Sequence, residues 1–351
     1  MATFTRFSSD DIVITTEKVF TSTWSNNTNA LVDHNEAVTS SAQNFVAATA
    51  TTESGLFFKE VFNGDASNAA NEPQYAASYG HRRGSGSKLF TSDDNGFSAT
   101  RSIYGQYRSL VFGDETRDFS FNTHTPDQIF IININRARYK QSLKPGSLNL
   151  ILKNSSVVTQ LTDDSITKSG SAVLTNIGRQ FNIVSGSSGV MSGSALSQTD
   201  SGSFGKFFPD AGLIILNADA LKSQGCVGTI TEGSDANNDN ISVLLDALDD
   251  AGADSNLGSA RSFEIDSEEK ISSQFYFVRA KNKEFNYTTN PSFIDTNGNL
   301  NFTSMVDNPV VYITTIGLYN DANELLAVAK LSQPVTKDFT KEALIKVKLD
   351  Y

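Results

Sequence analysis

Short runs of β-branched and aromatic residues, separated by polar turns, dominate the hydrophobic pattern of the chain. The run at residues 128–135 is apolar on both faces in its first half, which predicts a central strand covered on both sides. Residues 148–152 and 345–351 alternate between apolar and polar, which predicts strands with one buried face. Further strands are expected at 11–24, 56–62, 75–79, 157–161, 213–216, 275–278, 293–294 and 310–313, with a hairpin at 316–331.

Helical spacing of apolar residues occurs in two segments. The first covers about 98–112, with Ser98 as a possible N-cap and Gly113 as a C-terminal stop. The second covers about 241–251 and places its larger apolar residues on one stripe, namely Ile241, Leu244, Leu245 and Leu248. The pattern therefore predicts a mainly β protein with a few short helices, a β-rich α+β fold.

Two long polar stretches interrupt the predicted elements. Residues 25–55 are interpreted as a loop or extended arm, and the Ser/Gly-rich residues 185–205 as a flexible loop. We expect two packed, sandwich-like β regions, an N-terminal domain over 1–150 and a C-terminal domain over 151–351. No internal repeat of about 20–50 residues is visible, which argues against a solenoid or a propeller.

Composition and charge narrow the class of protein. Ser, Thr and Asn make up 104 of the 351 residues, so a coiled coil is excluded, while 24 Phe and 10 Tyr provide material for a packed core. The net charge of −11 argues against nucleic-acid binding, which needs a basic surface. Residues 82–153 carry a net charge of +5 and residues 200–269 a net charge of −11, so the two segments could attract each other between copies.

Few residues are available for metal or disulfide chemistry. The single Cys226 excludes an intrachain disulfide and a cysteine-cluster metal site. The three histidines, His34, His81 and His124, have no i, i+4 pair with which a helix could bind zinc. No signal peptide is expected from residues 1–9, and no membrane insertion, because no apolar run approaches about 18 residues.

Two stretches resemble ligand-binding loops only in part. Gly84–Lys88 (GSGSK) lacks the Gly-Lys step and the spacing of a phosphate-binding loop, so a basic contact loop is the better interpretation. Asp235–Asp246 begins with calcium-loop spacing but has Asn240 where such a loop needs Gly, and Asp295–Asn299 is a similar fragment. Metal binding remains open, and no cofactor is expected.

Hydrolytic chemistry has little support. The chain has no Gly-x-Ser-x-Gly elbow for a serine hydrolase, and the adjacent pairs Asp249–Asp250 and Glu268–Glu269 are expected to be solvated. Trp24 could line a carbohydrate groove, although core packing is its default role. Three cations after the central strand alternate onto one face, as an intersubunit contact or an exposed strand end: Arg136, Arg138 and Lys140. No catalytic residue is assigned.

Several stretches together resemble a structural protein of contractile-tailed phages that infect marine cyanobacteria. They are Tyr104–Arg108, Ile131–Lys140, Phe207–Ile214, and Gly317–Asn320 with Leu325–Leu331. The resemblance runs from about residue 11 to Tyr351, and none of these stretches is a catalytic motif. It implies a virion component of a cyanophage myovirus, located in the tail or baseplate and assembled in the host cytoplasm.

The expected function is therefore architectural and non-enzymatic. The protein would join neighbouring tail and baseplate proteins, in several symmetric copies, through apolar surface and strand-edge pairing. One alternative is a receptor- or glycan-binding module at the tail periphery. Another is a neck or head-surface protein, and an envelope-degrading enzyme is the least supported reading.

Overall fold

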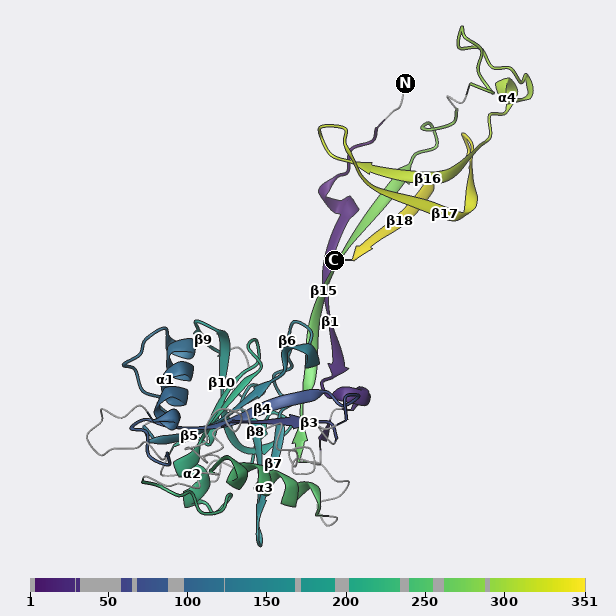
Figure 1. Ribbon diagram of the computed structural model, residues 1–351. Coiled ribbons are helices and arrows are strands. Elements are labelled where there is room, and N and C mark those ends of the chain that lie inside the picture. Colours follow the sequence, from purple (N-terminus) through teal and green to yellow (C-terminus); the bar gives the residue numbers. More distant parts are fainter. Residues whose placement is uncertain are drawn as a thin grey trace. The chain divides into compact units, whose positions relative to one another are not determined.

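Contacts within the chain form two compact units, which do not coincide with the predicted division at residue 150. Unit 1 comprises Met1–Lys18 and Lys270–Tyr351, and unit 2 comprises Val19–Glu269 (Figure 1). Strands β1 and β15 each cross this division. The computed structural model describes residues 4–28, 30–31, 58–64, 68–87, 98–122, 124–167, 172–192, 202–233, 240–254, 262–287 and 291–350.

Unit 2 is built on an antiparallel sheet. Its strands follow the order β2-β14-β7-β8-β10-β12-β13-β5-β4-β3, with β9 and β11 also paired to β10. Their bounds are β2 (Ala30–Leu31), β3 (Phe58–Phe62), β4 (Pro73–His81), β5 (Gln128–Ile134), β7 (Asn149–Asn154), β8 (Val157–Asp163), β9 (Val173–Thr175), β10 (Gly178–Ser187), β11 (Val190–Met191), β12 (Gly205–Phe208), β13 (Leu213–Asn217) and β14 (Phe263–Glu264). The predicted boundary near 150 falls inside β7, which pairs with β14 on one side and with β8 on the other.

The prediction of a central, doubly covered strand is confirmed for β5. This strand pairs with β4 on one side and with β13 on the other. Ile129 and Ile131 join the apolar cluster beneath α1, while Phe130 and Ile132 join the larger cluster shared with α2 and α3. Because successive strand residues point to opposite faces, an uninterrupted apolar run requires a cover on both.

The two predicted helices are confirmed within one residue at each end. They are α1 (Ala99–Phe112) and α3 (Asn240–Gly252), and Figure 1 shows α1 on one side of the unit 2 strands with α2 and α3 on the other. Gly113 ends α1 in the left-handed conformation, with φ +66°, and its amide donates to the Ser109 carbonyl at 2.8 Å. The pattern did not predict α2 (Ala218–Ser223), which the Asn217 side chain caps.

Unit 1 contains two small sheets. One has the order β1-β15-β18, formed by β1 (Ile12–Ser22), β15 (Asp266–Ala280) and β18 (Ala343–Asp350). Ser267 and Glu268, near the start of β15, belong to unit 2 and pair there with β6 (Ser142–Leu143). The other is the predicted hairpin, β16 (Val311–Tyr319) with β17 (Leu325–Lys337). The short α4 (Ser304–Asp307) precedes β16. The buried core between these strands consists of Ile316, Leu318 and Val347.

The predicted fold class is confirmed, since the protein is mainly β with a few short helices. The proposed loop at 185–205 is corrected at both ends, because β10 extends to Ser187, β11 follows, and β12 begins at Gly205. Of the proposed arm at 25–55, Ser25–Asn27 form a 3-10 turn and β2 follows, while residues 32–55 lie outside the described ranges. Within the described ranges, no helix is long and apolar enough to span a bilayer.

Candidate functional site

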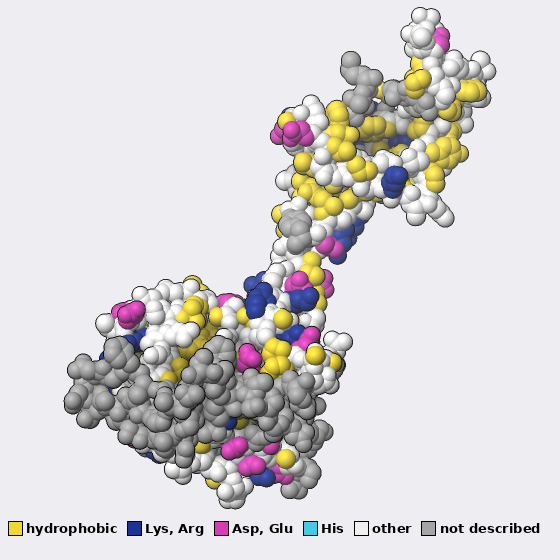
Figure 2. Space-filling model, viewed as in Figure 1, with side chains coloured by type: hydrophobic (Ala, Val, Ile, Leu, Met, Phe, Trp, Pro, Cys, Tyr) yellow, Lys and Arg dark blue, Asp and Glu magenta, His cyan; other side chains and the backbone are white. Residues whose placement is uncertain are grey.

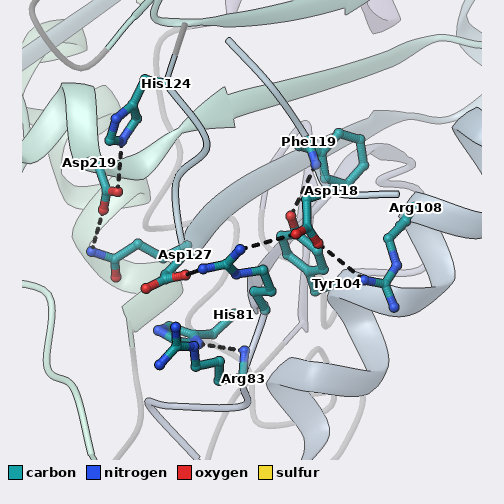
Figure 3. A network of polar contacts seen from close by, with 11 residues as sticks. His81, Arg83, Tyr104, Arg108, Asp118, Phe119, His124, Asp127 and Asp219 are labelled. Carbon is teal, nitrogen blue, oxygen red and sulfur yellow. Dashed lines mark hydrogen bonds and ion pairs between the residues drawn. The ribbon is translucent and has the colours of Figure 1, made fainter. Parts of the chain in front are cut away.

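A network of charged side chains surrounds Arg82 at the end of β4 (Figure 3). The Arg82 guanidinium contacts Asp118 at 3.0 Å and also pairs with Asp127, which immediately precedes β5. Arg108 of α1 reaches the other oxygen of Asp118 at 3.2 Å. The network thereby connects α1, β4 and the segment leading into β5.

Tyr104 continues this network into the core beneath α1. Its ring lies edge-on to Phe119 at 5.4 Å, and the Phe119 amide donates to the Tyr104 hydroxyl oxygen at 3.1 Å. The Arg108 guanidinium lies 5.6 Å from the Tyr104 ring centre. Burial raises the pKa of Tyr104 to about 12, so this hydroxyl stays protonated at neutral pH.

A second series of polar contacts lies at the start of β5, on the other side of the sheet. His124 Nε2 lies 3.2 Å from Asp219 of α2, and Gln128 donates to the same carboxylate at 2.9 Å. The Tyr79 hydroxyl donates in turn to Gln128 at 2.8 Å. Burial also raises the pKa of Tyr79, so this chain of contacts positions neutral and paired groups.

His81 occupies a buried position at the end of β4. Its Nδ1 accepts a hydrogen bond of 3.0 Å from the Arg83 amide (Figure 3), so the ring is neutral in this geometry. Burial lowers the pKa of His81, which favours the same form. Among the described residues, no group of three or more His, Cys, Asp and Glu side chains is placed to hold a metal ion. The hydrogen bonds and ion pairs of this network join residues of unit 2 to one another.

The Gly84–Ser87 part of the proposed contact loop is folded into unit 2. Gly84 and Gly86 have φ values of +88° and +75°, and the Gly86 amide donates to the Gly233 carbonyl at 2.9 Å. Ser85 accepts at its hydroxyl from the Gly233 amide and at its carbonyl from the Thr100 hydroxyl. Lys88 lies outside the described ranges. The described part of this loop is thus held by hydrogen bonds within unit 2.

Of the two calcium-like fragments, one is described as a turn. The Asp295 carboxylate accepts from the Asn297 and Asn299 amides at 2.8 Å each, and these backbone hydrogen bonds lower the Asp295 pKa. Such a turn needs no ion to explain it. Residues 235–239 of the other fragment lie outside the described ranges, while Asn240 forms two 2.8 Å hydrogen bonds with the Thr231 backbone.

Trp24 is a core residue, since its side chain is only 2% exposed. Its indole N–H donates to the Phe263 carbonyl at 3.1 Å, and the two rings meet edge-on at 4.9 Å. Trp24 nevertheless underlies a polar groove of about 430 Å³ in unit 2, lined by Ser22, Thr23, Ser25, Asn27, Asn63, Ala70, Glu72, Ala137 and Arg138. Sugar stacking on this indole is incompatible with its burial.

The sequence suggested that the three cations after β5 lie on one strand face. In the structure they do not. Arg136–Arg138 form a 3-10 turn, because the Asn135 side chain caps the Ala137 amide. The Arg136 guanidinium lies over the Tyr139 ring at 4.7 Å, whereas Arg138 pairs with Glu72 at 2.7 Å. Lys140 is exposed.

Charged segments of opposite sign meet within unit 2. Lys153 pairs with Asp254 at 2.7 Å, and Lys144 lies 3.6 Å from Asp266. The expectation that the adjacent carboxylates are solvated is wrong for Glu268, which is only 2% exposed. These charges stabilise the fold of a single copy.

Sequence reasoning did not single out Lys206 on β12. Its ammonium lies 5.8 Å from the centre of the Phe121 ring. Burial lowers the pKa of Lys206 to about 8, and the positive charge of Arg117 acts in the same direction. The only sequence signal was a charged residue within the apolar run Phe204–Phe208.

Unit 1 presents apolar side chains to solvent. Figure 2 shows hydrophobic side chains gathered on its surface, and on the outer side of the β16–β17 hairpin the exposed residues are Tyr319, Leu325, Leu326 and Val328. The Phe4 ring meets the Tyr319 ring at 5.0 Å, and a Cβ at Gly317 would lie 2.7 Å from Tyr319. Tyr319 therefore lies against the glycine and continues the apolar surface, which we call the hairpin face. It comprises Phe4, Tyr319, Leu325, Leu326 and Val328.

Comparison of the chain with protein-family models, with curated proteins and with solved structures found no match. The functional assignment therefore depends on the hairpin face, the polar contacts of unit 2 and the sequence resemblance described above.

Proposed function

We propose that this protein is a non-enzymatic structural component of a virion that joins neighbouring subunits in the baseplate of a contractile phage tail. The observation that carries the proposal is the hairpin face. Leu326 is 68% exposed and Val328 is 55% exposed, while the buried apolar cluster found among the described residues of unit 1 is Ile316, Leu318 and Val347. Contiguous apolar surface is typical of protein docking sites.

The contacts of unit 2 support a scaffold role. Several of its cationic side chains form ion pairs with carboxylates of the same unit, as Arg82 does with Asp118 and Asp127. The resemblance to cyanophage tail proteins supplies the particle and the place within it. The partners are then other tail and baseplate proteins.

Docking can be tested with purified tails. We expect the wild-type chain to bind tails that lack it, and Leu326→Asp to reduce binding by at least about tenfold, because a buried charge opposes association. The matched control is Leu110→Asp, at a 49% exposed position on α1 of unit 2. Equal binding of both variants would contradict docking through unit 1. Cryo-electron microscopy of the particle tests the location, since density on the neck or head would replace the baseplate assignment.

The polar groove favours a second candidate, glycan binding at the tail periphery. Glu72, Arg138, Asn27 and Asn63 bring carboxylate, guanidinium and amide groups to one concave surface, which suits sugar hydroxyls. A glycan array with wild-type protein and Asn63→Ala tests it. Selective binding that Asn63→Ala abolishes would favour receptor recognition, and an empty array would remove this candidate.

A further inference from the structure

Strand β16 has an unusual sequence for an edge strand. Val311–Tyr319 reads VYITTIGLY, which contains no charged residue and no proline. Among the described residues, β17 is the only strand that pairs with β16. The opposite edge of β16 therefore presents backbone N–H and C=O groups that another strand can bind.

The other outer strands of unit 1 carry the residues that usually prevent such pairing. Strand β1 contains Glu17 and Lys18, and β18 contains Lys346 and Lys348. Strand β17 carries Pro334, as well as Lys330 and Lys337. Charges and proline on an edge oppose strand addition, so β16 is the one described outer strand of unit 1 without this protection.

One face of β16 is buried along only half its length. Ile316 and Leu318 are each 8% exposed, whereas Tyr312 is 64% exposed. Strand alternation assigns Tyr312 to the same side as these two residues, although the pairing with β17 is irregular between Ile313 and Thr315. A second β16 running antiparallel would place its exposed half beside this buried half. Its Tyr312 would then cover the thin core at Leu318.

The distribution of charge identifies a second copy as the suitable partner. Unit 1 contains 11 Lys/Arg and 11 Asp/Glu, so its net charge is zero, whereas unit 2 contains 17 and 28 and carries the whole −11. Unit 1 is therefore the part through which two identical acidic chains can meet with little repulsion. An uncharged strand is also complementary to itself.

We propose that β16 pairs antiparallel with β16 of a second copy, centred on Thr315, and joins two hairpins into one four-stranded sheet. Tyr312 then lies opposite the second copy's Leu318, and Thr314 opposite its Ile316. The inference deepens the proposed assembly role, on which its biological meaning rests, because it names one partner as the same chain.

Sedimentation velocity of the full chain over a concentration series tests the pairing. We expect a monomer–dimer equilibrium for wild type, and Thr315→Lys to weaken dimerisation by at least about tenfold, since a charge on the edge opposes pairing. Gln333→Lys, at an exposed position of β17, adds the same charge away from β16 and should dimerise like wild type. A wild-type chain that stays monomeric, or a dimer unchanged by Thr315→Lys, would overturn the proposal.

Two further measurements keep the test decisive if Thr315→Lys misfolds. Amide hydrogen exchange of wild type should slow in β16 as dimer forms, and unchanged exchange would count against the pairing. In Thr315→Cys the two new thiols lie opposite each other in the proposed register, so oxidation should link the dimer. The native Cys226 is fully buried and does not compete for this link. A dimer without this link would overturn the Thr315-centred register. Loss of the dimer with retained tail binding would refute the inference alone, whereas a dimer that binds no tail would refute the proposed function alone.

Discussion

The guanidinium of Arg179 and the carboxylate of Asp210 form a bidentate ion pair that joins β10 to the turn between β12 and β13. Arg179 Nη2 lies 2.6 Å from Asp210 Oδ1 and Nε lies 3.2 Å from Oδ2, and the Arg179 amide also donates to Oδ2 at 2.8 Å. The Asp210 hydrogen bonds raise the pKa of Arg179, consistent with a permanently charged pair. One carboxylate thus fixes both the strand backbone and its side chain.

Replacement of Asp210 by Ala should lower the free energy of unfolding by about 1–3 kcal/mol, because three donors of Arg179 lose their acceptor. Urea denaturation measures the change. Glu342→Ala breaks the exposed pair with Arg279 and serves as the control, with an expected loss of about 0–1 kcal/mol. Equal losses would show that the bidentate geometry adds nothing.

Stability should depend on pH through His81. Its folded-state pKa is lowered by burial, so the unfolded chain binds the proton more tightly. The stability contribution of the neutral ring is therefore present above the unfolded pKa of about 6.5 and is lost as pH falls towards the lower folded value. His81→Asn keeps an acceptor for the Arg83 amide and removes this titration. Denaturation at pH 7.5 and 5.5 should show a smaller pH effect in the variant, and identical pH effects would refute the role of His81.

Lys206→Met should stabilise unit 2 at pH 7 by on the order of 1 kcal/mol, because the folded chain holds a desolvated charge there. The folded pKa of about 8 lies below that of an ordinary lysine, so the unfolded chain binds this proton more tightly. The folded state is therefore more stable at high pH, where Lys206 is neutral, and loses this stability as pH falls through 8. The gain from Lys206→Met should accordingly shrink at pH 10. Lys140→Met, at an exposed position, should change little at either pH. A loss of stability in Lys206→Met at pH 7 would contradict the desolvation argument.

Lys337→Met should destabilise unit 1 selectively. The Lys337 ammonium is fully buried and donates to the Asn282 carbonyl, the Asn286 side chain and the Asp338 carbonyl at 2.7–3.0 Å. Removal leaves these oxygens without that donor and should cost about 1–3 kcal/mol. Hydrogen exchange should accelerate in β15 to β18 while that of β5 stays unchanged. The control is Lys330→Met on the exposed side of β17, and an equal effect there would point to charge alone.

Most helices and strands could be predicted because caps, turns and the periodicity of apolar residues depend on neighbouring positions in the sequence. Ser98 and Gly113 bracket α1 in the sequence as they do in the structure, and the apolar run of β5 indicated a strand covered on both faces. The six-residue α2 is too short to show a helical period, and its cap, Asn217, is also the last residue of β13. The predicted strand at 293–294 is reduced to an isolated bridge between Ile294 and Leu300, because the Asp295 turn curls the chain there.

Long-range contacts explain what the sequence could not predict. Arg82, Asp118 and Asp127 form one network only because β4, the end of α1 and β5 meet in the fold. The environment of Lys206 depends on Arg117, which is 89 positions away in the sequence. The units likewise do not follow a single cut near residue 150, since unit 1 combines both flanks of the chain around a contiguous unit 2.

This arrangement sets an order of events on the ribosome. Unit 2 is contiguous and can fold once residue 269 has emerged, whereas residues 4–18 must wait for β15 and β18 before unit 1 can close. Residue 350 is 81 positions after residue 269, so at about 5–20 residues per second the delay after unit 2 is on the order of 4–16 s. The hairpin face and the outer edge of β16 are thus completed after unit 2. Under the proposed pairing, two nascent chains on one messenger meet only once unit 2, which carries the net charge of −11, has emerged from each ribosome.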